Sequence, residues 1–151
     1  FENDDDDGTL DQLYISGIPL ETIFLSKAFF IWLITCIPII IFSPFIMFLF
    51  NIQLEKTINL FFSLLIGTPI LCLIGSITSA LMLGFKRGGA VISLITLPLY
   101  LPVLIFGIEA SNSELILNEL SKEFKILIGY LLIVIATTPW IGGLALRLKY
   151  K

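Results

Sequence analysis

Residues 28–50 read AFFIWLITCIPIIIFSPFIMFLF and contain no Asp, Glu, Lys or Arg. Three further charge-free runs follow, at 58–85, 90–108 and 126–146, and the four runs are 19 to 28 residues long. A helix needs about 20 apolar residues to cross the hydrocarbon layer of a bilayer. The sequence therefore predicts an all-α polytopic membrane protein with four transmembrane helices, at about 28–50, 58–85, 90–108 and 126–146.

The composition is typical of a membrane domain. Of the 151 residues, 57% are hydrophobic and 14% are charged, whereas a soluble domain has about 25% charged residues. Because four spans use most of the length, we predict a cytoplasmic segment at 1–27, one transmembrane domain at 28–146 and a cytoplasmic tail at 147–151. The chain opens with Phe1 rather than Met, and we expect it to be a fragment of a longer protein.

The basic residues predict the orientation of the spans. Six basic residues are predicted on one side of the membrane: Lys27, Lys86, Arg87, Arg147, Lys149 and Lys151. Three are predicted on the other: Lys56, Lys122 and Lys125. Loops rich in Lys and Arg stay in the cytoplasm. The start, the turn at 86–89 and the tail are therefore predicted to be cytoplasmic, and the loops at 51–57 and 109–125 external.

A short amphipathic helix is predicted before the first span. Thr9 and Gln12 have the spacing of a capping box, and Gly17 and Pro19 would end the helix. Its apolar stripe consists of Leu10, Leu13 and Tyr14. The helix rests on lipid or docks on a cytoplasmic partner. The acidic residues before it favour the partner, because anionic head groups repel them.

The spans themselves carry three patterns. Leu20, Ile23, Phe24 and Ala28 lie on one face of a helix that begins after Pro19, and Pro38 and Pro44 predict a kinked or broken first span. Small residues form one face of the second span, which predicts close helix packing or, as the alternative, a face that lines a substrate path. They are Gly67, Thr68, Cys72, Gly75, Ser76, Ser79 and Ala80.

Two prolines four residues apart mark the third span. Pro98 and Pro102 deprive the carbonyls of Leu94 and Pro98 of their helical donors. Such carbonyls are tolerated in a membrane only against protein or water. We therefore expect this stretch in the protein interior, where Pro98, Tyr100, Pro102 and Gly107 are candidates for a gate or helix break.

Most catalytic chemistry is excluded by residue content. The chain has no histidine, so the commonest general base and metal ligand is missing. The four runs contain no charged residue, which argues against ion coupling, and there is no P-loop motif or basic nucleic-acid-binding patch. We predict no catalytic or metal site and no enzyme activity, but a transport, channel or scaffold subunit whose energy comes from a partner.

Several segments resemble the CcmB family of haem exporter permeases. The matching segments are FEND (1–4), DGTLDQL (7–13), Leu20, Lys27, Trp32, the stretch 38–44, LIGTP (65–69), Ile74-Gly75 and LPLYLPVLIFG (97–107). The last is the most specific. The resemblance covers essentially the whole chain and implies the last four helices of a six-helix type-2 ABC permease, with the segment at Gly8-Thr9-Leu10 as its coupling helix.

The resemblance also implies partners. They are a cytoplasmic ABC ATPase subunit (CcmA), a haem-handling membrane protein (CcmC), a small single-span subunit and a haem chaperone (CcmE). The implied role is in cytochrome c maturation, in a bacterial or mitochondrial inner membrane. The partner ATPase uses ATP, and its hydrolysis releases the haem-loaded chaperone. Haem is the implied transported or handled ligand, although Met47, Met82 and a few tyrosines are the chain's only conventional haem ligands.

Within this resemblance, the residues implied to dock on the ATPase are Thr9, Leu10, Leu13 and Tyr14. Two alternatives stay open. A generic type-2 ABC permease for another amphiphile shares the fold and the Gly-Thr-Leu helix but gives no reason for the Pro98–Pro102 run. A structural scaffold subunit would support maturation even when its partner ATPase is inactive.

Overall fold

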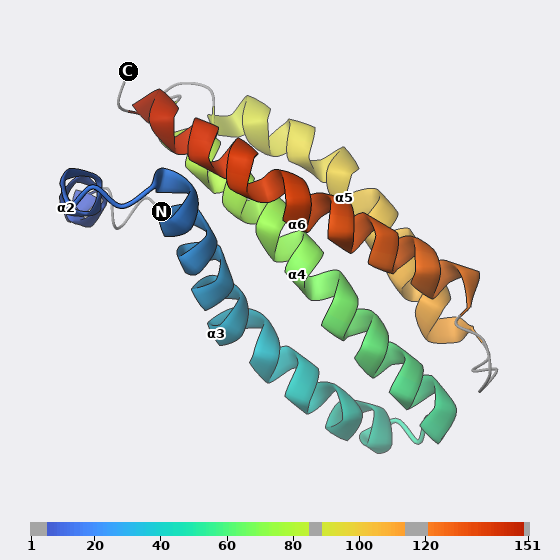
Figure 1. The fold of residues 1–151 in the computed structure, drawn as a ribbon. Coiled ribbons are helices and arrows are strands. Elements are labelled where there is room, and N and C mark those ends of the chain that lie inside the picture. Colours follow the sequence, from blue (N-terminus) through green and yellow to red (C-terminus); the bar gives the residue numbers. More distant parts are fainter. Residues whose placement is uncertain (1–5, 85–88, 114–120, 150–151) are drawn as a thin grey trace.

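The computed structural model describes residues 6–84, 89–113 and 121–149. These residues form α2 (Thr9–Ile15), α3 (Leu20–Leu49), α4 (Leu54–Gly84), α5 (Gly89–Asn112) and α6 (Lys122–Lys149), and contain no strand. Figure 1 shows α3 to α6 as one elongated bundle, with α2 lying across the outside of one end. The predicted all-α architecture is confirmed for the described residues. The predictions on residues 1–5, the basic turn at 86–87, the loop at 114–120 and the last two residues fall outside them.

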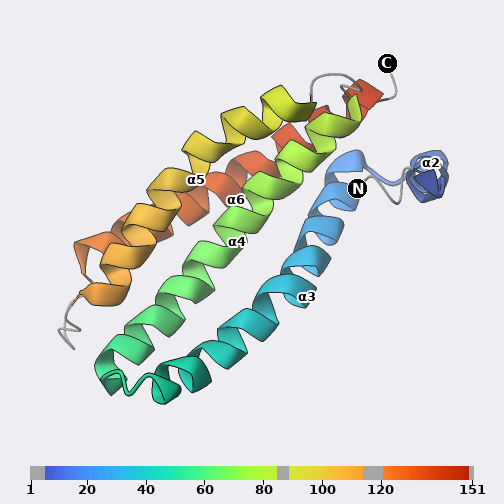
Figure 2. The ribbon, with the colours of Figure 1, turned by 180° about the vertical axis from the view of Figure 1, so that it is seen from behind.

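The helix α4 is the centre of the bundle. It packs against α3, α5 and α6, whereas α3 and α5 lie on opposite sides of it (Figure 2). Its predicted small face is confirmed as a packing face, because Thr68 and Ser76 are buried and Ala80 is fully buried. A Cβ added to Gly67 would lie 3.8 Å from Cγ1 of Val103 in α5. The two helices therefore approach closely there.

Three of the described helices are long and apolar enough to cross a membrane: Leu20–Leu49, Leu54–Leu83 and Lys122–Leu148. The chain is thus a multi-pass membrane protein. The first candidate begins at Leu20 rather than at the predicted residue 28. The fourth predicted span, 90–108, coincides with α5, which is not among the three, so a fourth crossing stays a prediction.

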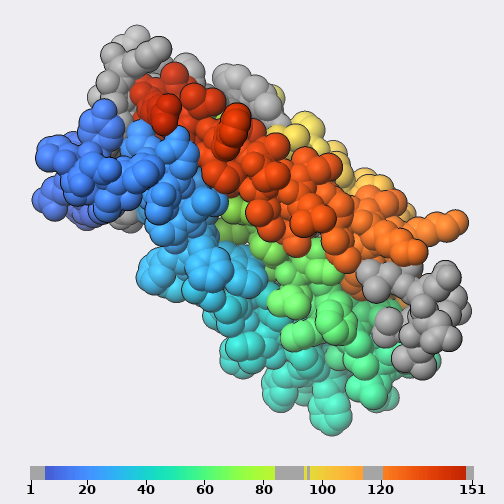
Figure 3. Space-filling view, in the orientation of Figure 1, coloured from blue at the N-terminus to red at the C-terminus, as the bar shows by residue number. Residues whose placement is uncertain are grey.

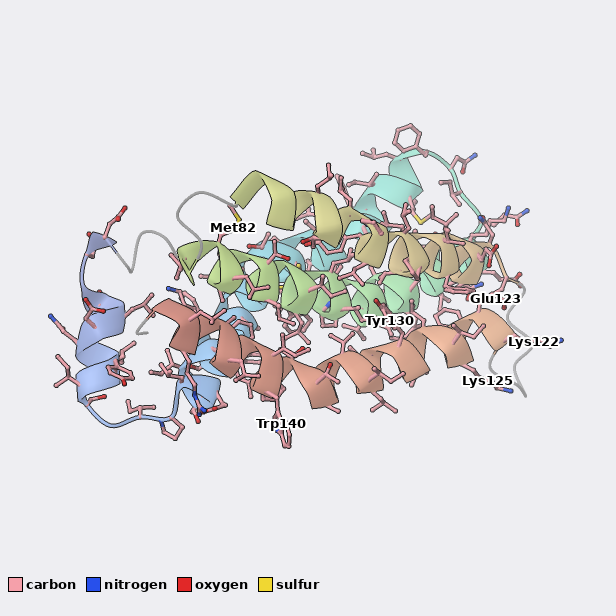
Figure 4. All side chains as sticks on the ribbon, turned by 90° about the horizontal axis from the view of Figure 1, so that it is seen from above. Met82, Lys122, Glu123, Lys125, Tyr130 and Trp140 are labelled. Atoms are coloured by element: carbon pink, nitrogen blue, oxygen red, sulfur yellow. The ribbon has the colours of Figure 1, made fainter. Side chains whose placement is uncertain are left out.

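The two ends of the bundle agree with the predicted alternation of loops. In Figure 1, α2, the C-terminal ends of α4 and α6 and the start of α5 gather at one end. The C-terminal ends of α3 and α5 and the starts of α4 and α6 lie at the other. Figure 4 shows Lys122, Glu123 and Lys125 together at the end far from α2.

The prolines do not break the helices that contain them. Pro38 and Pro44 both lie inside α3, which is continuous from Leu20 to Leu49, so this span is not broken and the alternative, a kink, stays a prediction. Pro44 has no N–H for the Ile40 carbonyl. The buried Ser43 hydroxyl donates to that carbonyl at 2.9 Å instead, and this substitution of donors allows the helix to continue in an apolar medium.

We expect Ser43→Ala to destabilise the protein by about 1–3 kcal/mol, because the buried Ile40 carbonyl then loses its side-chain donor. The measurement is thermal unfolding in detergent. The Ser43→Ala/Pro44→Ala double variant should recover most of the loss, since alanine at 44 restores a backbone N–H. Equal stability of Ser43→Ala and wild type would contradict this role of the hydroxyl.

The proline-rich stretch of α5, which the sequence placed in the interior, is buried on one face only among the described residues. Leu97, Leu99 and Leu101 are 59%, 49% and 55% exposed, whereas Val103 is 2% exposed. The helix packs one face on α4 and α6 and turns the other outward. The prolines are tolerated because each removes a single helical bond while the rest of α5 remains helical.

Candidate functional site

Helix α2 is attached to the bundle by Leu10. This side chain is 3% exposed and packs into a cluster that we call the α2 junction. Its buried members come from four helices: Leu10, Leu20, Ile23, Phe24, Ala28, Ala80, Ala145 and Leu146. Leu20, Ile23, Phe24 and Ala28 are the residues that the sequence placed on one face, and all four are buried. The junction thus places the short helix in one buried cluster with residues of α3, α4 and α6.

The start of α2 differs from the predicted capping box. Gly8 is the N-cap, with a φ of 70°, and no side chain caps the helix. Thr9 is therefore already the first helical residue, so the predicted Thr9–Gln12 box is wrong. A left-handed N-cap favours glycine, which has no Cβ. The predicted end is confirmed: the helix finishes at Ile15, Gly17 has a φ of 77°, and Pro19 is the N-cap of α3.

The junction depends on a close crossing of α3 and α6. A Cβ added to Gly142 would lie 2.5 Å from Cγ and Cδ1 of Phe24, and Phe24 is fully buried. The neighbouring Gly143 lies beside the side chain of Glu21. A Cβ added to Gly143 would lie 2.7 Å from Cγ of Glu21. The Gly142-Gly143 pair thus lets the start of α3 lie close to the α6 backbone. Figure 3 shows the two helices, blue and red, touching at this end of the molecule.

An ion pair lies at the edge of the same crossing. Arg147 Nη2 donates to Glu21 Oε1 at 2.6 Å, and the two side chains are 59% and 32% exposed. An exposed pair of this kind contributes about 0–1 kcal/mol. The crossing is therefore held mainly by the burial of Phe24, and the ion pair orients the helix ends.

The predicted docking residues of α2 differ in how far they are buried. Leu10 faces the junction and Leu13 packs partly against it, so neither side chain offers its full surface to a partner. Thr9 is exposed, Tyr14 is 48% exposed and Ile15 is 82% exposed. The outward apolar surface of α2 therefore consists of Tyr14 and Ile15, beside the exposed Asp11.

A second constellation lies along the α4–α5 seam. Ser63 Oγ donates to the Gly107 carbonyl at 2.6 Å, and the Thr78 and Thr96 hydroxyls are 2.8 Å apart. Asn59 is 1% exposed and its Nδ2 donates to the Ser113 carbonyl. Asn59 Oδ1 has no hydrogen-bond partner among the described residues. Polar side chains thus link the two helices along most of their common length.

The candidate gate residues are spread along this seam rather than gathered at one point. Pro98, Tyr100, Pro102 and Gly107 all lie within α5. The Gly107 carbonyl accepts the hydrogen bond from the Ser63 hydroxyl. The Tyr100 hydroxyl lies close to α4, because a Cβ added to Gly75 would be 2.8 Å from the phenol oxygen. Pro98 is exposed and Pro102 half-buried. The gating role of these four residues stays a prediction.

Sequence reasoning missed several of these residues. The Gly142-Gly143 pair was visible as two glycines in an apolar helix, but no pattern indicated that Phe24 would lie on it. Asn59, the one amide in the second apolar run, was a usable signal of a polar contact. The residues that the structure describes contain no group of three His, Cys, Asp or Glu side chains suited to a metal ion.

Comparison with known proteins gives a consistent result. The sequence model of the family described as CcmB protein matches residues 1–149. Heme exporter protein B of Rhodobacter capsulatus is 33% identical over 151 residues, which is 100% of this chain and 69% of that protein. The proteins of the same name from Paracoccus denitrificans and Bradyrhizobium diazoefficiens are 34% and 36% identical. These two matches cover 100% and 97% of this chain, and 69% and 67% of the relatives.

Proposed function

The chain belongs to the CcmB protein family, and on that basis we propose that it is the permease subunit of an ABC-type complex for cytochrome c maturation. The relatives are heme exporter proteins, which indicates haem as the molecule that the complex handles. The proposed location is the bacterial inner membrane. ATP is used by a cytoplasmic partner subunit (CcmA), and the other proposed partners are CcmC, a small single-span subunit and the haem chaperone CcmE.

The observation that carries the proposal is the attachment of α2. A coupling helix transmits the movement of an ATPase to the membrane domain. One face of the helix must therefore bind the ATPase, and the opposite face must pack on the membrane domain. Ile15 is 82% exposed while Leu10 is 3% exposed, so α2 meets both requirements. Leu10 belongs to a buried cluster that also contains residues of α3, α4 and α6, so a displacement of α2 would reach the long helices through this cluster.

The acidic charge around α2 favours a protein partner over the membrane surface. Asp6, Asp7 and Asp11 are exposed, and carboxylates are repelled by the anionic lipids of a cytoplasmic leaflet. A basic groove on a partner would instead be attracted to them, which raises the rate of encounter. The exposed Tyr14 and Ile15 would supply the apolar contact.

The test is deletion of the full-length gene, followed by haem staining of membrane proteins and a blot for haem on the chaperone. We expect loss of all c-type cytochromes while haem stays attached to the chaperone, with recovery when the wild-type gene is returned. An ATPase-inactive partner should give the same block. Normal c-type cytochromes in the deletion strain would contradict the proposal and favour a permease for another amphiphile. Maturation with an inactive ATPase would favour a scaffold.

A further inference from the structure

A pocket of about 480 Å³ lies between α2 and the first turns of α3. Figure 1 shows these two segments beside each other at one end of the bundle. The pocket therefore borders both the predicted coupling helix and a candidate membrane span. The described residues that line it are Leu13 of α2, Ile18 of the connection, and Thr22, Ile23, Ser26, Lys27 and Phe30 of α3.

The pocket combines apolar walls with one positive charge. Four of its described lining residues are apolar, and one of them, Phe30, is 61% exposed. Lys27 is the single charged residue among those described lining residues. A suitable ligand therefore has an anionic group and an apolar body.

Two hydroxyl side chains, Thr22 and Ser26, lie in the same lining. Ser26 Oγ donates to the Thr22 carbonyl at 2.8 Å, so its proton is already used. The Thr22 side chain is exposed, and its hydroxyl can donate to a ligand. A hydroxyl donor next to a positive charge suits an anionic oxygen.

The depth of Lys27 in the membrane indicates the source of that anion. With 30 residues, α3 is about 45 Å long, which is about the thickness of a bilayer with its head groups. Lys27 lies about 10 Å along α3 from Leu20, near the boundary between head groups and hydrocarbon. Side chains of a helix point toward its N-terminus, so the Lys27 side chain is directed toward the layer of lipid phosphates.

The Lys27 ammonium can bind a phosphate from within the pocket. Its nitrogen is shielded from solvent, and the flexible four-carbon stem lets it turn toward a ligand. It has three N–H donors, so it can hold a phosphate oxygen in addition to another partner. Attraction between opposite charges is stronger where water is excluded.

The charge of α2 favours one type of head group. Asp6, Asp7 and Asp11 are exposed, and carboxylates repel lipids with a net negative charge. A zwitterionic head group also carries a phosphate, but its ammonium group is attracted to the same acids. Arg147 does not offset these acids, because it is paired with Glu21.

We infer that the pocket between α2 and α3 binds a zwitterionic phospholipid, with Lys27 and Thr22 on the phosphate and an acyl chain along Phe30. Since Leu13 and Ile18 also line the pocket, the lipid braces the short helix against the membrane span. This site is independent of the molecule that the permease handles.

The experiment is a titration of the full-length protein in detergent with phosphatidylethanolamine or phosphatidylglycerol of the same acyl chains, followed by native mass spectrometry. We expect one phosphatidylethanolamine per chain, bound more tightly than phosphatidylglycerol. Lys27→Gln should weaken this binding about tenfold, whereas Lys27→Arg should keep it. Lys122→Gln is the matched control, because Lys122 is an exposed basic residue at the end of the bundle far from α2 (Figure 4).

A second variant tests the pocket without removing its charge. Ser26→Leu narrows the pocket and should also weaken lipid binding, while thermal unfolding in detergent shows that each variant is folded. Wild-type affinity in Lys27→Gln or in Ser26→Leu would overturn the inference. An equal loss in Lys122→Gln would also overturn it, since lipids would then be held by general surface charge. Tighter binding of phosphatidylglycerol would overturn the assignment to a zwitterionic lipid.

Discussion

Gly142→Ala should destabilise the protein by about 1–3 kcal/mol, although alanine is the better helix former. The new Cβ would lie 2.5 Å from the ring of Phe24, and this ring is fully buried among α3, α4 and α6. It cannot move without opening the α2 junction. We therefore expect a lower unfolding temperature in detergent and faster proteolysis of α2.

Two other glycines of α6 provide graded controls. Gly129→Ala should leave stability unchanged or raise it by up to about 1 kcal/mol, because nothing lies within 4 Å of the added Cβ. Gly143→Ala should have an intermediate effect, since it displaces the side chain of Glu21, which can swing into solvent.

A double-mutant cycle identifies the cause. Phe24→Leu removes part of the ring, so Gly142→Ala should cost less in that background than in the wild type. A stability loss in Gly142→Ala equal to that in Gly129→Ala, or full additivity with Phe24→Leu, would show that the crossing does not depend on this contact.

Leu10→Asp should release α2 from the bundle and abolish coupling to the ATPase. Leu10 is 3% exposed, and an unpaired carboxylate at that position would cost several kcal/mol. Helix α2 has seven residues and a single buried side chain. Releasing it from the bundle therefore costs less free energy than burying the charge. We expect faster hydrogen exchange in α2, unchanged exchange in α4, and loss of c-type cytochromes in cells.

Ile15→Asp is the matched variant on the opposite face of the same helix. Ile15 is 82% exposed, so the charge should leave α2 attached and its hydrogen exchange unchanged. If the outward face binds the ATPase, this variant should still reduce co-purification of that subunit. Normal co-purification in both variants would contradict the docking role of α2. Undocking by Ile15→Asp but not by Leu10→Asp would show that the junction is wrongly assigned.

Much of the architecture could be predicted from the sequence. Charge-free runs near membrane thickness predicted the long helices, and the three candidate spans of the structure agree with three of them. The spacing of Leu20, Ile23, Phe24 and Ala28 predicted one buried face, and the structure buries all four. The small residues of α4 predicted its packing role, which Ala80 and Ser76 confirm.

The errors have a common origin. The prolines of α3 suggested a kink or a break, but the helix is continuous because each proline removes one backbone bond and a side chain such as Ser43 can replace the donor. The prolines of α5 suggested a buried stretch, but that helix buries only one face. The threonine-glutamine spacing suggested a cap, but Gly8 could adopt the left-handed conformation that begins the helix one residue earlier. Local patterns compete with one another, and the sequence does not show which one prevails.

The sequence by itself determined the helices, their membrane character and the amphipathic nature of α2. The tertiary structure alone decided that Leu10 faces the bundle while Ile15 faces outward, that Phe24 lies on Gly142, and that Tyr100 stands over Gly75. The reason is physical. Periodicity shows which residues share one face of a helix but not which helix lies opposite. In a membrane protein the lipid-facing side is as apolar as the packed side, so hydrophobicity does not distinguish them.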